Sequence, residues 1–121
     1  MSRTILIVDD SATMRDLVRH TLMDAGFGVV EGANGQEGLD RLGAQKVDLV
    51  ISDVNMPVMD GITFVQRLRT LPSYKFTPVL MLTTETQAAK KDAAKAAGAT
   101  GWVVKPFSPE QLQTVVRRVL P

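Results

Sequence analysis

Five polar side chains stand just past the ends of short apolar runs, and their types suit chemistry on a phosphate group. The set joins three carboxylates to one hydroxyl and one ammonium: Asp9, Asp10, Asp53, Thr83 and Lys105. Three carboxylates held close together repel one another and have raised pKa values unless a cation neutralises them. Mg²⁺ is the predicted cation, with Mn²⁺ as a substitute, because it accepts carboxylates, water and phosphate as ligands. The pattern therefore predicts a metal-assisted phosphate site.

Asp53 is the predicted nucleophile because it ends the central apolar run, which leaves Asp9 and Asp10 to hold the metal. A carboxylate can attack phosphorus and form an aspartyl phosphate. Phosphoryl transfer needs little beyond positioning and neutralisation of the phosphoryl oxygens. The metal, the Lys105 ammonium and the Thr83 hydroxyl are expected to take one oxygen each.

Five apolar runs recur along the chain and predict five β-strands. They cover residues 4–8, 28–31, 47–52, 78–82 and 101–104. Most are apolar without alternation, as parallel strands covered by helices on both faces require. Segments with helical spacing lie between the runs, and helix start and stop signals flank them at Ser11, Gly26, Gly98 and Ser108. The prediction is an α/β fold of the (βα)₅ type, a doubly wound, flavodoxin-like parallel sheet in the order 2-1-3-4-5, with residues 1–121 forming one domain.

This topology also predicts where the polar residues gather. In an open parallel sheet, ligands bind beyond the carboxyl ends of the strands, at the point where the winding reverses. Here that point lies between the first and third predicted strands, which lead into Asp9, Asp10 and Asp53. The five polar side chains are therefore expected to meet at one edge of the sheet.

Composition excludes several classes of protein. The chain has no cysteine, so disulfide frameworks and thiolate metal sites are ruled out, and a reducing cytoplasm is the expected compartment. Its one histidine, His20, falls off the apolar stripe of a predicted helix and is expected to face solvent, which argues against zinc. A net charge of +1 does not favour nucleic-acid binding. No apolar stretch approaches the roughly 20 residues that span a bilayer. A soluble monomer is expected.

Four segments between residues 5 and 107 together form a specific signature: ILIVDDSATMR, DLVISDVNMPVMDG, VLMLTTE and GWVVKPF. In order and spacing they resemble the response-regulator receiver domains, and most of all the stand-alone chemotaxis receivers of the CheY type. The resemblance implies that a histidine kinase of the CheA type phosphorylates Asp53, with small donors such as acetyl phosphate as substitutes. The implied metal ligands are Asp10, Asp53 and the backbone carbonyl of Asn55, with Asp9 acting through water.

The same resemblance assigns roles to further residues. Thr83 corresponds to the switch hydroxyl and Lys105 to the phosphate-binding lysine, whose bond to Pro106 is often cis in the family. Asn55 and Glu85 occupy the two positions that tune self-dephosphorylation.

The aromatic switch position of the family falls on Trp102, where tyrosine or phenylalanine is commoner. Because tryptophan is bulkier than either, its ring is expected to stay outward in both states of the switch. The alternative is an ordinary packing role for this ring.

By resemblance, the output surface comprises the fourth predicted helix, the fifth strand and the fifth helix. This region is basic through Lys90, Lys91, Lys95, Arg117 and Arg118. A charged helix face is often merely solvated, but as a binding surface it suits an acidic peptide or helix. The family's prime candidate is a flagellar motor switch protein, which would place the chain in chemotaxis, and a phosphatase is a further expected partner.

Other functions remain open from sequence. A phosphate sink or a relay receiver would share the same residues. A receiver that signals without phosphorylation usually lacks one of the acids, the threonine or the lysine, all of which this chain retains. A haloacid-dehalogenase-type phosphatase needs a D-x-D motif after its first strand, whereas this chain has Asp9-Asp10-Ser11 there and no cap insertion.

Overall fold

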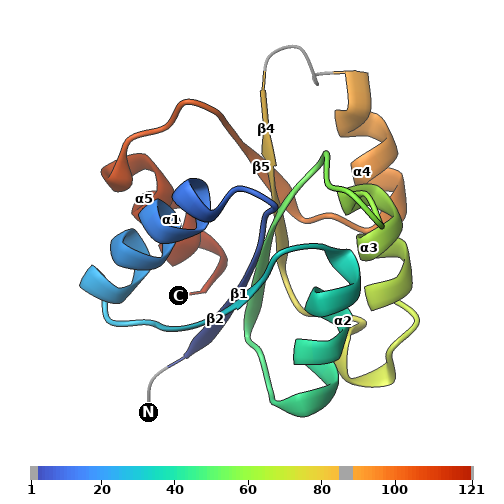
Figure 1. The fold of residues 1–121 in the computed structure, drawn as a ribbon. Helices are drawn as coiled ribbons and strands as arrows, with labels where there is room; N and C mark the ends of the chain where they lie inside the picture. The colour runs from blue at the N-terminus through green and yellow to red at the C-terminus, as the bar shows by residue number, and fades with distance from the viewer. Residues whose placement is uncertain (1–2, 85–88, 121) are drawn as a thin grey trace.

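The computed structural model describes residues 3–84 and 89–120, and Figure 1 shows a central sheet between two groups of helices. The strands are β1 (Thr4–Val8), β2 (Gly28–Gly32), β3 (Leu49–Asp53), β4 (Val79–Thr83) and β5 (Gly101–Val104). The helices are α1 (Ala12–Asp24), α2 (Gly35–Ala44), α3 (Gly61–Leu68), α4 (Lys91–Ala97) and α5 (Pro109–Val119), with a short 3₁₀ helix η1 (Pro72–Tyr74) before β4.

All five strands pair in parallel in the order β2-β1-β3-β4-β5, which confirms the predicted doubly wound (βα)₅ fold. Helices α1 and α5 cover one face of the sheet, and α2, α3 and α4 cover the other (Figure 1). Each face buries its own apolar cluster, one around Phe64 and Leu68 and one around Ile7 and Leu22. Because β3 lies between both clusters, all of its residues are buried.

Three strands end one residue further than their apolar runs: β2, at Gly32, and also β3 and β4. β3 ends at Asp53 and β4 at Thr83, whereas the apolar patterns predicted ends at residues 52 and 82. Asp53 still pairs with Leu82 and Thr83 with Val104, so the ladder continues through the polar residues. Both side chains are therefore held by rigid strand backbone, which fixes their positions more closely than a loop would.

The predicted helix signals are confirmed. The hydroxyls of Ser11 and Ser108 accept the N–H groups of Met14 and Gln111 at the starts of α1 and α5. Gly26 and Gly98 have φ of +93° and +114°, a conformation that glycine adopts without a steric penalty. No helix in the described part of the chain is long and apolar enough to cross a membrane.

Candidate functional site

Three carboxylates meet at the carboxyl edge of the sheet, between β1 and β3. Asp9 and Asp10 directly follow β1, and Asp53 is the last residue of β3. One carboxylate oxygen from each lies within 4.8 Å of the other two. Asp9 and Asp53 are buried, whereas Asp10 is exposed. The structure therefore brings together the predicted acids, with one open side at Asp10.

Lys105 enters this cluster from the segment after β5. Its Nζ lies 3.2 Å from Oδ1 of Asp53 and 3.7 Å from Oδ2 of Asp9. The bond from Lys105 to Pro106 is cis, as in many members of the resembled family. Among the described residues, one ammonium faces three carboxylates in this cluster, which leaves an excess of negative charge that a further cation would balance.

Asp9 shows that excess most clearly, because its side chain is fully buried. Its Oδ1 accepts the Ser11 N–H at 2.9 Å, but Oδ2 has no hydrogen-bond partner among the described residues. Burial raises the pKa of Asp9, the Ser11 N–H opposes this, and the charge of Asp53 raises it further. An unpartnered buried carboxylate oxygen beside two other acids fits a hard divalent cation with oxygen ligands.

Asp53 is positioned by backbone contacts that were not predicted from the sequence. Its Oδ1 accepts the Val54 N–H at 2.9 Å, and the N–H of Gly61 donates to the Val54 carbonyl at 2.8 Å. The start of α3 thus lies directly against β3. A Cβ on Gly61 would overlap the Asp53 carbonyl oxygen and lie 3.0 Å from its carbonyl carbon. The Asp60-Gly61 pair that closes the D-x-N-M-P-x-M-D-G motif was the available signal for this approach.

Thr83 lies at the end of β4 with 1% of its surface exposed. Its hydroxyl oxygen is buried and has no hydrogen-bond partner among the described residues. A buried hydroxyl without a partner is costly, so a group that bonds to it would stabilise the site. Glu85, the second predicted tuning residue, lies outside the described residues.

Asn55 stands at the exposed side of the site, two residues past Asp53. Its Oδ1 accepts a hydrogen bond from Lys90 Nζ at 2.7 Å. Lys90 was predicted to belong to the basic output surface, but its ammonium contacts Asn55 at the site instead. Because the pair is 35 residues apart in sequence, only the fold brings these side chains together.

Trp102 points outward from β5 and is 38% exposed. The Nζ of Lys91 lies 5.1 Å from the centroid of its ring, within the range of a cation–π contact. The ring is outward in this conformation, and its expected outward position in both states of the switch stays a prediction. Its role in switching stays a prediction.

Replacing Lys91 with alanine is expected to shift the fluorescence emission of Trp102 to longer wavelength, because the lysine no longer covers the ring. Stability should fall by about 1 kcal/mol or less, as for an exposed cation–π contact. Trp102 is the one tryptophan in the chain, so the spectrum reports this ring alone. Lys95→Ala, exposed on the same helix, is the control. An unchanged spectrum in Lys91→Ala would contradict the contact.

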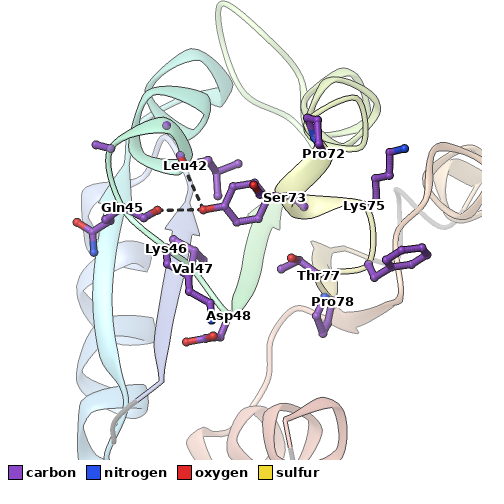
Figure 2. Close-up of a pocket in the computed structure, with 14 residues that line it drawn as sticks. Leu42, Gln45, Lys46, Val47, Asp48, Pro72, Ser73, Lys75, Thr77 and Pro78 are labelled. Carbon is purple, nitrogen blue, oxygen red and sulfur yellow. Dashed lines mark hydrogen bonds between the residues drawn. The ribbon is translucent and has the colours of Figure 1, made fainter.

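The structure also contains two larger hollows. One of about 700 Å³ lies beside the turns that enter β3 and β4, where the Tyr74 hydroxyl donates to the carbonyls of Leu42 and Gln45 (Figure 2). Because it precedes these strands, it lies at the opposite edge of the sheet from the acids. The other hollow, of about 600 Å³, lies between β5 and α5 and is lined by Trp102 and Phe107 among others. Neither contains the acidic cluster.

A parallel sheet with three acids, a threonine and a lysine at its carboxyl edge defines a class of signalling domain. The sequence matches the response regulator receiver domain over residues 5–117, so the chain belongs to this family. Within the family it is similar to the CheY chemotaxis proteins. It is 37% identical to chemotaxis protein CheY1 of Helicobacter pylori over 118 residues, which is 96% of this chain and 95% of that protein.

Solved structures agree with this assignment. Chemotaxis protein CheY4 of Vibrio cholerae is 52% identical, with a TM-score of 0.94 over 98% of this chain and 99% of that one. The receiver domain of the sensor histidine kinase PA1611 from Pseudomonas aeruginosa shares the fold at 23% identity, with a TM-score of 0.91 over 99% of this chain and 98% of that one. That structure holds a magnesium ion coordinated in its active site cleft.

Proposed function

We propose that this chain is a phosphorylation-activated response regulator of a two-component system and that Asp53 accepts the phosphoryl group. The observation that carries the proposal is the placement of Asp53. Its carboxylate is buried at the centre of the site, 3.2 Å from the Lys105 ammonium and grouped with Asp9 and Asp10. The donor is a phosphohistidine of a CheA-like histidine kinase, or a small acyl phosphate.

Mg²⁺, or Mn²⁺ in its place, is the proposed cofactor. The residues that would hold it are Asp9, Asp10 and Asp53 through their carboxylates and Asn55 through its backbone carbonyl. The Oδ2 of Asp9, which accepts no hydrogen bond from the described residues, and the excess of negative charge support this set. When bound, the ion supplies positive charge to the phosphoryl oxygens.

The chain's own residues position the transfer. Among the described residues, both contacts to the Asp53 carboxylate fall on Oδ1, from the Val54 N–H and the Lys105 ammonium. Oδ2 is therefore the proposed nucleophile, forming the new P–O bond as the P–N bond of the phosphohistidine breaks. The donor imidazole leaves as the neutral base or takes a proton from solvent. Lys105 neutralises charge on the phosphoryl oxygens, which is the main requirement of this reaction.

Phosphorylation acts on Thr83 because the new oxygens offer a partner to its buried hydroxyl, which has no hydrogen-bond partner in the described part of the chain. A hydrogen bond to a charged group contributes about 1.5–3 kcal/mol. Reversing a 1:99 population needs about 5.5 kcal/mol, so this bond alone does not complete the switch. Pairing with Lys105 and the binding of a partner must add to it. We therefore expect incomplete activation without a partner.

The proposed output surface is formed by α4, β5 and α5. It contains the hollow beside Trp102, and Lys91, Lys95, Arg117 and Arg118 lie on its helices. This chemistry suits an acidic helix or peptide of the partner. Similarity to the CheY chemotaxis proteins favours a flagellar motor switch protein as that partner, a phosphatase that ends the signal, and a cytoplasmic monomer.

The test is to incubate wild type, Asp53→Ala and Asp40→Ala with acetyl phosphate and Mg²⁺ and to measure intact mass. Wild type and Asp40→Ala, which alters an exposed carboxylate on α2, should gain one phosphoryl group, and Asp53→Ala should gain none. Modification of Asp53→Ala would contradict the assignment of the acceptor. Turnover of a small phosphate ester at tens per second would favour a phosphatase instead.

A further inference from the structure

The negative charge of the acidic cluster repels an anionic phosphodonor that approaches the phosphorylation site. In the described part of the site, three carboxylates, of which Asp10 is exposed, are grouped with one ammonium, that of Lys105. A bound divalent cation offsets that charge, but phosphodonors carry negative charge of their own and must approach past the exposed Asp10. A cation at the entrance would favour their approach.

Lys90 supplies a cation there. It directly precedes α4 and donates to Oδ1 of Asn55 at 2.7 Å, which places its ammonium beside the segment that follows Asp53. Both side chains are exposed, so the ammonium remains accessible to an arriving anion. The contact holds a flexible side chain over the segment that follows Asp53.

The position of Lys90 is not explained by helix stability. It occupies the N-cap of α4, where its side chain makes no capping hydrogen bond. Its backbone is itself helical, with φ of −84° and ψ of −8°, so the residue is not an extended cap of the kind that serine or aspartate provides. No capping bond of α4 therefore depends on the Lys90 side chain, whose hydrogen bond goes to Asn55 instead.

We propose that Lys90 recruits the anionic phosphodonor to the entrance of the site and that Asn55 holds the lysine in position. The proposal rests on the function proposed above. Lys90 thus favours anionic donors by attracting them to the site, whereas Lys105 contacts the acceptor carboxylate of Asp53.

The expected size of the effect follows from Coulomb's law. Two unit charges about 6 Å apart in water interact strongly enough to change a second-order rate constant about threefold. Lys90→Gln should therefore lower the rate constant for phosphorylation by acetyl phosphate about threefold, and Lys90→Glu about tenfold. Lys90→Arg keeps the charge and should restore most of the wild-type rate.

The experiment measures this rate constant by intact mass at saturating Mg²⁺, in about 0.05 M and about 1 M salt. The screening length falls from above 10 Å to about 3 Å over that range, so the differences between variants should largely disappear at high salt. Lys95→Gln, which removes an exposed lysine of the same helix, is the matched control and should match wild type. In an Asn55→Ala background, Lys90→Gln should have a smaller effect because the lysine is no longer held.

Two outcomes would contradict the proposed role of Lys90 and leave the proposed function of the protein standing. One is phosphorylation of Lys90→Gln and Lys90→Glu at the wild-type rate in low salt. The other is a loss that persists at high salt, which would indicate a structural defect. A wild-type protein that accepts no phosphoryl group would instead overturn the proposed function, and this role with it.

Discussion

Gly61→Ala is expected to destabilise the protein by about 3 kcal/mol, or roughly 12 °C in Tm, and to lower phosphorylation of Asp53. The added Cβ would overlap the Asp53 carbonyl oxygen, which belongs to rigid strand backbone. The backbone at Gly61 does not have positive φ, so the conformation itself would accept alanine. The cost arises from the overlap, which forces α3 away from β3 and displaces the acceptor.

Gly43→Ala is the matched control, because it makes the same change on α2 where, apart from the adjoining helix backbone and chain neighbours, no atom lies within 4 Å of the new Cβ. It should stabilise the protein by about 0.5–1 kcal/mol, as alanine is the better helix former. Thermal unfolding of both variants checks the prediction. Equal stability of Gly61→Ala and wild type would show that α3 can move away from Asp53 without cost.

Asp9→Asn is expected to be more stable than wild type in the absence of a divalent cation and less stable than wild type in its presence. In EDTA at pH 7 the variant should be more stable than wild type, by on the order of 1 kcal/mol or roughly 4 °C, because it removes a buried carboxylate with one oxygen that accepts no hydrogen bond from the described residues. At Mg²⁺ concentrations about 100-fold above the dissociation constant, wild type should gain about 2.7 kcal/mol. The variant should gain much less, since it has lost a metal ligand.

The difference in EDTA should depend on pH, because burial raises the pKa of Asp9 above its ordinary value of 3.8. The folded state then binds the Asp9 proton more tightly than the unfolded state. Wild type therefore loses stability relative to Asp9→Asn as the pH rises from 3.8 through the raised pKa, and the two converge below that window.

Thermal unfolding in EDTA at several values between about pH 3.5 and about pH 7 would measure this difference. The lower limit lies below the ordinary pKa of the carboxyl group, and the upper limit is neutral pH. Asp40→Asn is the control, as it makes the same change at an exposed carboxylate and should follow wild type at each pH. Lower stability of Asp9→Asn than wild type in EDTA at pH 7 would mean that the contact with Lys105 outweighs the cost of burial.

The sheet, its strand order and the edge that holds the site could be predicted from the sequence alone. Continuous apolar runs define buried parallel strands, and right-handed crossovers leave few ways to order them. Because all the strands point the same way, residues at their carboxyl ends meet at one edge. Asp9, Asp53, Thr83 and Lys105 could thus be grouped without a structure, although the apolar pattern stopped one residue before the true ends of β3 and β4.

Only the tertiary structure decided which of these groups are buried and what they contact. Asp9 and Asp10 are neighbours of the same type, yet one is fully buried and the other exposed, because successive side chains point in different directions. Two contacts depend on how the helices pack. One is the close approach of Gly61 to β3, which leaves no room for a side chain, and the other is the hydrogen bond from Lys90 to Asn55. Sequence patterns report the local periodicity of the chain, whereas these contacts depend on how distant elements pack to within a few tenths of an ångström.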